Sequence, residues 1–501
     1  MGSSIAKERM AGVLMHPTSL PSPYGIGDMG KGAYDFIDFL AKSGQSLWQV
    51  LPLGPTGYGD SPYQLFSAFA GQPLIISPDK LIEMNLLSGE EVADNPAWGD
   101  RVDYGPVVEY KNLILKRAFS HFIMNEDAEL AGKYQQFIRN NAFWLEDYAL
   151  YMACKEANGG TAWIDWKDEY RNPSEQEKET IKRTLDDKTE FYRFVQFIFF
   201  IQWSELKSYA NERGIKIIGD MPIFVAFDSA DVWASKDLFK LDEKGYPLSV
   251  AGVPPDYFSA TGQLWGNPVY DWDVMKADGF RWWVLRITHQ LKLYDFIRID
   301  HFRGFEAFWA VPYGEETAVN GEWIKAPGEE LFWKIRQSLG TDIPIIAEDL
   351  GVITPEVEAL RDKFALSGMK VLQFAFDSDA KNPFLPHMSV ANSICYTGTH
   401  DNDTTLGWYN TASDYTRKHC KEYLRIGSEG VVKAMIATAL SGISRMAVVP
   451  LQDYLELGSE GRMNTPGAVC GNWSWRCKTG DFSDELANEI LRLTILYGRK
   501  N

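Results

Sequence analysis

The sequence predicts an α/β fold, a (β/α)8 barrel of the TIM type with long, largely helical insertions between its strands. Three observations lead to this fold class. The chain contains eight short apolar runs bounded by turn-forming residues, helical patterns separate several of them, and the runs are continuously apolar. Alternating strands and helices imply parallel pairing, and continuously apolar strands imply burial on both faces. Eight parallel strands are the number that a closed barrel of this type requires.

The strands are predicted from runs rich in Val, Ile, Leu and aromatic residues. They are expected at 12–16 (GVLMH), 47–53 (LWQVLPL), 215–220 (IKIIGD), 294–300 (YDFIRID), 343–348 (IPIIAE), 369–376 (MKVLQFAF), 393–399 (SICYTGT) and 446–450 (MAVVP). Helical patterns follow the first strand (GAYDFIDFLAKSG), precede the fifth (GEELFWKIRQSLG) and follow it (TPEVEALRDKF). The segment from Asp484 onward predicts a closing helix.

Two long segments interrupt this spacing within what we expect to be a single barrel over residues 1–501. Residues from about 65 to 205 contain long helical patterns and predict a helical insertion after the second strand. Its apolar run 189–209 resembles a membrane span, but Arg193, Gln196 and Gln202 within the run favour a core helix. Residues from about 221 to 290 are rich in Pro and Gly, which predicts a loop-rich, irregular insertion after the third strand, bordering the functional site.

Composition limits the partners of this chain. The 501 residues carry a formal net charge of −18, and nucleic acid and anionic membranes both attract Lys and Arg patches that the sequence lacks. We therefore expect no nucleic acid and no membrane as partner, and a neutral or cationic ligand instead. The five cysteines match neither a zinc pattern nor a disulfide framework, and no secretory segment is evident. A cytoplasmic location is expected.

Carboxylates follow four of the predicted strands. Asp220 ends IIGD, Asp300 ends FIRID, Glu348 follows IPIIA, and Asp401 lies in TGTHD. Packing of the core alone would not place charges after buried strands. Barrels that cleave sugars need converging carboxylates at one rim, so this pattern indicates glycosidic chemistry.

Arg298 and Asp300 are two residues apart on a predicted strand, so their side chains point to the same face, into the barrel mouth. An arginine beside an aspartate favours the ionised form, which suits a nucleophile. Taken alone, the pair fits a structural ion pair equally well.

Glu348 follows an apolar run, where partial burial would hold a proton for donation to a leaving oxygen. Strand alternation should turn Asp349 away from the mouth. Glu348 could instead cap the next helix, but Thr354 is expected to supply that cap. His400 and Asp401 could hold adjacent sugar hydroxyls, although such residues in a Gly/Thr/Asn-rich loop more often form turns.

Metal and phosphate chemistry are both disfavoured. The seven histidines are scattered and no HxH or HExxH spacing occurs, so we expect no metal site. The glycine-rich loop PLGPTGYGDSPYQ lacks the Lys-Ser/Thr ending of a phosphate loop. Its Tyr58, Asp60, Ser61 and Tyr63 mix flat apolar faces with hydrogen-bonding groups, which suits a sugar. Any one of these aromatics could also belong to the core.

The motifs together resemble those of a known family. The chain resembles the 4-alpha-glucanotransferases of the amylomaltase or disproportionating-enzyme type, glycoside hydrolase family 77 of the alpha-amylase superfamily. The resemblance covers residues 12 to about 476 and depends on the segments HPTSLPSPYGIGD, WQVLPLGPTGYGDSPYQ, SAFAGQP, GDMPIFVA, DSADVW, VAGVPPDYFSATGQLWGNPVY, RIDHFRGF, IIAEDLG, TGTHDNDT and GRMNTPG.

The resemblance implies a catalytic (β/α)8 barrel that needs neither metal nor cofactor. It implies that Asp300 is the nucleophile, Glu348 the acid/base and Asp401 the stabiliser of the distorted donor sugar. It further implies substrate contacts, of which Asp220, Arg298, His301 and His400 would line the subsite where the bond breaks, Tyr63, Trp265 and Asn464 would touch donor- and acceptor-side glucan, and Tyr58 would touch glucan farther away.

The implied reaction transfers part of an α-1,4-glucan to the 4-hydroxyl of another glucan or of glucose, by a monomer or a homodimer. Ala260 departs from the family, because SATG replaces the SETG of many members. Two alternatives remain, namely a hydrolase of the alpha-amylase kind that uses the same carboxylates, and a glucan-binding protein without catalysis.

Overall fold

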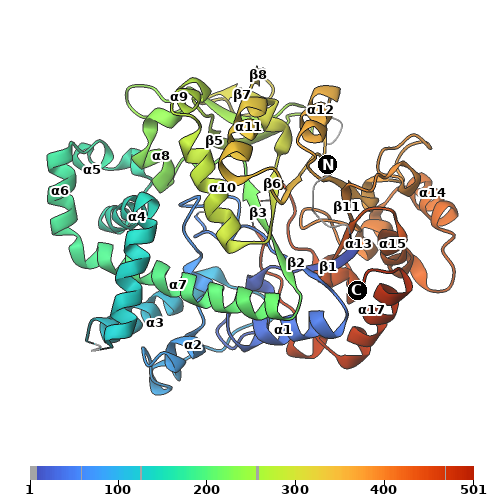
Figure 1. The fold of residues 1–501 in the computed structure, drawn as a ribbon, viewed down its shortest axis with the longest axis horizontal. Coiled ribbons are helices and arrows are strands. Elements are labelled where there is room, and N and C mark those ends of the chain that lie inside the picture. Colours follow the sequence, from blue (N-terminus) through green and yellow to red (C-terminus); the bar gives the residue numbers. More distant parts are fainter. Residues whose placement is uncertain (1–7, 58, 125–126, 256–258, 469, 501) are drawn as a thin grey trace.

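Eight parallel strands form the central barrel of this protein (Figure 1). The computed structural model describes residues 8–57, 59–124, 127–255, 259–468 and 470–500. The barrel strands are β1 (Met10–Leu14), β2 (Leu47–Gln49), β3 (Lys216–Pro222), β6 (Phe296–Asp300), β9 (Ile345–Ala347), β10 (Gly368–Val371), β11 (Ser393–Tyr396) and β12 (Met446–Pro450). The predicted fold class and all eight predicted strands are confirmed.

The second and sixth predicted strands are too long. The second, predicted to reach residue 53, ends at Gln49, and the apolar run 369–376 continues past β10, where Leu372–Phe374 form a 3-10 helix. Apolar side chains alone do not distinguish a buried strand from a buried turn of helix, so periodicity could not detect this boundary.

The barrel closes between β9 and β10. Along the sheet the strands run β10-β11-β12-β1-β2-β3-β6-β9, and a parallel bridge between Ile346 and Ser367 connects the two ends. The carboxylate of Asp349 strengthens this seam, because it accepts a hydrogen bond of 2.7 Å from the backbone N–H of Met369. Asp349 therefore points away from the mouth, as strand alternation predicts.

Helices surround the strands, with one departure from strict alternation. The outer helices include α1 (Lys31–Lys42), α7 (Asp186–Glu212), α10 (Arg281–Leu293), α11 (Gly328–Leu339), α12 (Pro355–Lys363), α13 (Thr405–Thr411), α14 (Asp414–Leu424), α15 (Gly430–Ser441) and the closing helix α17 (Asp484–Leu496). Between β10 and β11, a stretch that is described throughout, the chain forms only 3-10 turns and no α-helix, whereas three helices lie between β11 and β12.

The segment from 65 to 205 is mainly helical. It contains α2 (Pro78–Glu83), α3 (Tyr104–Met124), α4 (Ala128–Ala157), α5 (Asp168–Arg171), α6 (Glu175–Thr184) and most of α7. In Figure 1, α4, α5 and α6 lie on the opposite side of the barrel from α13–α15. The division of the chain into one barrel and two insertions stays a prediction.

The apolar run 189–209 is a core helix, as predicted, and forms part of α7. Its polar side chains are used internally, since the buried amides of Gln196 and Gln202 bind the backbones of Gly71 and Ser77 in the loop that follows β2. Among the described residues, no helix is long and apolar enough to cross a membrane.

The segment from about 221 to 290 contains regular elements that the sequence did not predict. It contains α8 (Ala230–Ala234), α9 (Trp272–Ala277) and two strands, β4 (Ser249–Val253) and β5 (Gln263–Pro268). These strands join β7 (Ala307–Pro312) and β8 (Glu322–Lys325) in an antiparallel sheet of order β5-β4-β7-β8. Glycine supports this sheet, because a Cβ at Gly252 would lie 2.4 Å from the carbonyl oxygen of Gln263.

A buried arginine ties the two ends of the described chain to the barrel. Arg499, only 1% exposed, donates hydrogen bonds to the backbone carbonyls of Met10 in β1 (2.8 Å), Leu440 in α15 (2.6 Å) and Ser444 before β12 (3.0 Å). A buried charge is tolerated only when it is well hydrogen-bonded, and these carbonyls supply the bonds; that of Leu440 also accepts a bond of 2.8 Å from Arg9.

Replacing Arg499 with Ala should destabilise the fold by about 3 kcal/mol, because it removes the bonds that this side chain donates to the buried carbonyls of Met10, Leu440 and Ser444. A lower midpoint of thermal or denaturant unfolding would measure this effect. Arg492→Ala on the exposed face of α17 is the control and should change stability little. An equal loss of stability in both variants would contradict the assigned role of Arg499.

Candidate active site

Asp300 and Glu348 lie at the carboxyl ends of neighbouring parallel strands. Ile299 of β6 pairs in register with Ala347 of β9, so the next residue on each strand is an acid. Backbone hydrogen bonds continue past the strands, from Glu348 N–H to Ile299 O (3.0 Å) and from Phe302 N–H to Glu348 O (3.1 Å). Strand register thus fixes both acids at the rim where active sites of such barrels lie.

A buried guanidinium joins two of the predicted site residues. The side chain of Arg298 is 4% exposed, and its Nη1 lies 2.7 and 2.6 Å from the two carboxylate oxygens of Asp220 and 3.1 Å from Oδ1 of Asp300. Asp220 of β3 pairs directly with Arg298 of β6 in the sheet. The hydroxyl of Tyr63 donates a further bond of 2.8 Å to Asp220. Arg298 therefore has a fully buried carboxylate on one side and a partly exposed one on the other.

The carboxylate of Glu348 is held by the backbone beside it. Oε2 accepts a hydrogen bond of 2.7 Å from His301 N–H, and Oε1 accepts one of 2.9 Å from Leu350 N–H. Glu348 is thus not occupied in capping α12. The prediction that Thr354 caps this helix through its side chain is wrong. Thr354 occupies the N-cap position, but its hydroxyl makes no capping hydrogen bond. Pro355 follows as the first helical residue and has no N–H to satisfy.

Burial is the main influence on the protonation of both acids. Burial raises the pKa of Glu348 to about 7, partly opposed by Arg298 and by the two backbone donors. Burial also raises the pKa of Asp300, while Arg298 lowers it and the charges of Asp220, Glu348 and Asp401 raise it further. The side chain of Asp300 is 31% exposed, so contact with solvent reduces the effect of burial on its pKa. The two acids interact and titrate as a pair near neutral pH.

His301 adopts an unusual backbone conformation next to Asp300. Its φ of +53° lies in the left-handed region, which costs energy for a residue other than glycine. The turn directs the imidazole against Trp265, whose ring lies edge-on at a centroid distance of 4.8 Å. Burial lowers the pKa of His301 to about 3, so this ring is neutral at physiological pH. The predicted residues His301 and Trp265 are therefore in contact.

Asp401 is held by a segment near the end of the chain. Its Oδ1 accepts a hydrogen bond of 2.7 Å from the side-chain amide of Asn464, and its backbone carbonyl accepts one of 2.9 Å from Arg462. Arg462 also donates to the carbonyl of Asn464 (2.8 Å). The side chain of Asp401 is half exposed. Its charge raises the pKa of both Asp300 and Tyr63, which puts all three groups in one electrostatic environment.

His400 lies in an aromatic stack beside Asp401. Its ring is parallel to that of Tyr63 at a centroid distance of 5.1 Å and tilted against Trp473 at 6.0 Å, and its Nε2 lies 3.4 Å from Oδ1 of Asp401. Burial lowers the pKa of His400, so the neutral form predominates at neutral pH. Tyr63 thus connects two parts of the site, because its hydroxyl donates to Asp220 and its ring stacks on His400, the neighbour of Asp401.

The predicted residues Asp60 and Ser61 lie in the loop that precedes Tyr63. Tyr58 lies outside the described residues. Ser61 is turned toward its own loop, since its hydroxyl accepts a hydrogen bond of 3.2 Å from Tyr63 N–H. Asp60 adopts a left-handed backbone with φ of +57°, and burial raises the pKa of its carboxyl. No contact joins Asp60 or Ser61 to the three acids among the described residues.

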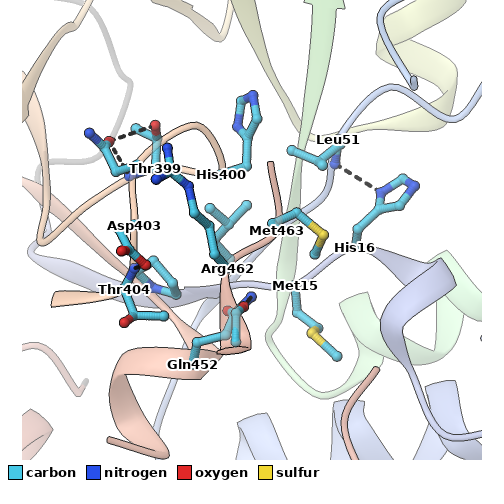
Figure 2. Close-up of a pocket in the computed structure, with 14 residues that line it drawn as sticks. Met15, His16, Leu51, Thr399, His400, Asp403, Thr404, Gln452, Arg462 and Met463 are labelled. Carbon is cyan, nitrogen blue, oxygen red and sulfur yellow. Dashed lines mark hydrogen bonds between the residues drawn. The ribbon is translucent and has the colours of Figure 1, made fainter. Parts of the chain in front are cut away.

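A pocket lies under the loop that carries His400, between the ends of β1, β11 and β12. It is open to solvent, and its lining includes His16, Leu51, His400 and Met463. Figure 2 shows Met463 between the two histidines, with Nδ1 of His16 accepting a hydrogen bond from Leu51 N–H. Burial and the nearby His400 lower the pKa of His16 to about 3.

Three residues of this site were not predicted: His16, Arg462 and Trp473. Each is a single residue in a loop, without periodicity or a paired acid to mark it. The pattern of an acid directly after a predicted strand, which identified the acids of the site, therefore could not identify them. Among the described residues, no group of three or more His, Cys, Asp or Glu could hold a metal ion.

Comparison with known proteins identifies the family. The family model described as 4-alpha-glucanotransferase matches residues 15–482. The chain belongs to the 4-alpha-glucanotransferase family. It is 51% identical over 500 residues to the 4-alpha-glucanotransferase of Synechocystis sp., with 98% of each chain covered, and 52% identical over 486 residues to that of Thermus thermophilus, with 95% and 96% covered.

A solved structure supports the same family. The amylomaltase from Streptococcus agalactiae in complex with acarbose superposes with a TM-score of 0.95 at 39% identity, and the match covers 99% of this chain and 100% of that one. The predicted family is therefore confirmed.

Replacing Asp220 with Asn should lower the pKa of Asp300. Asp220 raises that pKa directly and also neutralises Arg298, so its removal leaves Arg298 to stabilise the ionised Asp300. The shift can be measured by a ¹³C-NMR titration of protein labelled at aspartate carboxyls. Tyr63→Phe is the control, because it removes the hydrogen bond to Asp220 without changing a charge, and it should shift the titration less. An unchanged or raised pKa in Asp220→Asn would contradict this electrostatic account.

Proposed function

We propose that, in this 4-alpha-glucanotransferase, Asp300 is the nucleophile, Glu348 the acid/base and Asp401 the stabiliser of the donor sugar, and that the reaction retains the α linkage. Membership of the 4-alpha-glucanotransferase family supports the reaction class. One structural observation carries the assignment of roles: Asp300 and Glu348 follow paired residues of neighbouring strands, and Arg298 faces Asp300 whereas backbone N–H groups hold Glu348. Retaining glycosidases use two carboxyls in this way.

In the first half of the reaction, the ionised carboxylate of Asp300 attacks C1 of the donor glucose. The glycosidic bond breaks, and its oxygen takes the proton of Glu348 as the shortened glucan leaves. Burial raises the pKa of both acids, so one of the pair can hold a proton at neutral pH, and the contact of Arg298 with Asp300 assigns that proton to Glu348. Arg298 faces Asp300 and favours the anion that must attack.

In the second half, Glu348 acts as a base. It removes the proton from the 4-hydroxyl of an acceptor glucan, the hydroxyl oxygen attacks C1, and the ester bond to Asp300 breaks. Two inversions restore the α linkage. An acceptor sugar held by aromatic side chains competes with water for the intermediate, and the contact of Trp265 with His301 puts one such aromatic next to the nucleophile.

Sugar contacts are proposed for the remaining predicted residues. His400 and Asp401 would hold adjacent hydroxyls of the donor glucose, and Tyr63 would offer its ring to the same sugar. Asn464 would act both on the glucan and on Asp401, whose carboxylate it holds. Asp220 would act through Arg298. The structural support is weaker for Asp60 and Ser61 than for these residues.

Several predictions stay untested. These are contact of Tyr58 with glucan, the monomeric or homodimeric state, the cytoplasmic location, and the absence of a cofactor, a nucleic-acid partner and a membrane partner.

Incubation with maltotriose alone should give glucose together with a ladder of longer maltooligosaccharides. Hydrolysis cannot produce a chain longer than its substrate, so the ladder separates transfer from hydrolysis. Products are resolved by chain length. Glucose and maltose without the ladder would indicate a hydrolase, and no products at all would indicate a glucan-binding protein.

Asp300→Asn provides the matched control for catalysis. Removing the nucleophile should abolish the ladder while maltotriose binding, measured by calorimetry, is retained. Transfer at the wild-type rate in this variant would contradict the role proposed for Asp300.

Ala260→Glu should change how the acceptor is used. Ala260 is exposed in a turn closed by hydrogen bonds between Ser259 and Gly262, just before the strand that carries Trp265. One added hydrogen bond, worth about 1 kcal/mol, would lower the KM for acceptor glucose about fivefold or raise the ratio of transfer to hydrolysis by that factor. Ala260→Gln adds the same length without charge and serves as the control. Acceptor KM and product ratio that both match the wild type would contradict this role of position 260.

A further inference from the structure

Asp453 is a buried carboxylate that lies directly behind the loop carrying Asp401. It belongs to α16 (Leu451–Tyr454), the short helix that follows β12, and it is 1% exposed. Oδ2 accepts hydrogen bonds from the hydroxyls of Thr397 (2.5 Å) and Thr405 (2.7 Å), and Oδ1 accepts one from Thr405 N–H (2.7 Å). The three donors lie on either side of the loop that joins β11 to α13.

The donors lie at the two ends of that loop. Thr397 directly follows β11, and Thr405 begins α13, so one carboxylate holds together the entry and the exit of residues 397–405. His400 and Asp401 lie between these ends. Closing a loop at its base greatly reduces the conformations open to its tip, and side chains that act at a reacting centre require such restriction.

The other contacts of the loop complete this arrangement. Asn402 closes a small turn by accepting two bonds of 2.9 Å from the N–H and hydroxyl of Thr399. Gln373 donates to the carbonyl of Asp403 (2.9 Å). The backbone N–H of Gln373 also donates to Thr397 O (3.2 Å), so Gln373 joins residues 397 and 403 from the β10 side. Asp453 holds the same base from the β12 side, and it is the carboxylate that binds both Thr397 and Thr405.

We propose that Asp453 is a positioning residue for transfer: it never touches the glucan, but it fixes the base of the 397–405 loop so that Asp401 faces the donor sugar. This proposal rests on the function proposed above for Asp401. Asp453 belongs to the segment after β12, while Asp401 belongs to the loop after the neighbouring strand β11. The segment after one strand therefore holds the loop that follows the other. The three hydrogen bonds of Asp453 satisfy both oxygens of this buried carboxyl group.

The test replaces Asp453 with Asn. An amide whose oxygen takes the place of Oδ2 can still accept from both hydroxyls, but its NH₂ group then faces Thr405 N–H, so two donors oppose each other at the exit of the loop and loosen its base. With maltotriose, kcat should fall about 10- to 100-fold, as expected for a displaced catalytic group, while KM changes by less than about twofold. A fall of less than about twofold in kcat of folded protein would overturn the proposal.

A second measurement separates positioning from general damage. In an Asp401→Asn background, Asp453→Asn should slow the enzyme by less than about twofold further, because the group that it positions is already absent. An α-glucosyl fluoride donor keeps these slow variants measurable. Equal fold losses in both backgrounds would overturn the proposal in favour of a structural role. An Asp401→Asn variant as fast as the wild type would instead overturn the function assigned to Asp401.

If Asp453→Asn does not fold, variants of its partner Thr397 test the same proposal. Thr397→Val removes one donor without changing the side-chain shape and should lower kcat severalfold, and Thr397→Ser should restore most of it. Thr189→Val is the matched control, since it removes a buried hydroxyl that donates to Leu185 O (2.9 Å) within α7, far from the loop in sequence. A loss of kcat in Thr189→Val equal to that in Thr397→Val would overturn the proposal.

Discussion

The buried guanidinium of Arg298 is the interaction on which the rest of the site depends. A charge on a strand inside a barrel is costly unless a counter-charge meets it, and Asp220 on the adjacent strand meets it with both carboxylate oxygens. The register of β3 with β6 makes this possible, because it pairs the two residues directly. Once neutralised in this way, Arg298 can face Asp300 at 3.1 Å without a net positive charge buried in the barrel.

The acids of the site are held in two different ways. Asp300 and Glu348 take their positions from strand register, which is rigid and belongs to the barrel itself. Asp401 takes its position from side-chain hydrogen bonds made by separate segments, namely Asn464 and Arg462 on the mouth side and Asp453 through the base of the loop. The site therefore combines two acids set by the fold with one set by loops that the chain adds after β11 and β12.

Sequence patterns predicted those parts of the structure that repeat. Eight apolar runs gave eight strands, and an acid after four of them gave Asp220, Asp300, Glu348 and Asp401 at one rim. Strand β10 was predicted too long because Leu372–Phe374 continue its apolar run into a 3-10 helix. Strands β4 and β5 were missed because their glycines suggested an irregular loop, although Gly252 is what allows Gln263 to approach.

The contacts made by single loop residues could not be predicted. Nothing in the sequence indicates that Trp473 would pack against His400, or that the Thr354 hydroxyl would leave its helix uncapped. Asp453 is an exception. It follows the apolar strand MAVVP by three residues, so the same acid-after-strand pattern could have identified it, but it points into the core rather than the mouth.

Direct identification of the nucleophile tests the central claim. The Glu348→Gln variant lacks the base of the second half-reaction, so an α-glucosyl fluoride donor, whose leaving group needs no proton, should load it with a lasting glycosyl ester. Proteolysis and mass spectrometry then locate the sugar. The account predicts one glycosyl group on Asp300. A sugar on Asp401 or Asp220, or no covalent adduct while fluoride is still released, would contradict it.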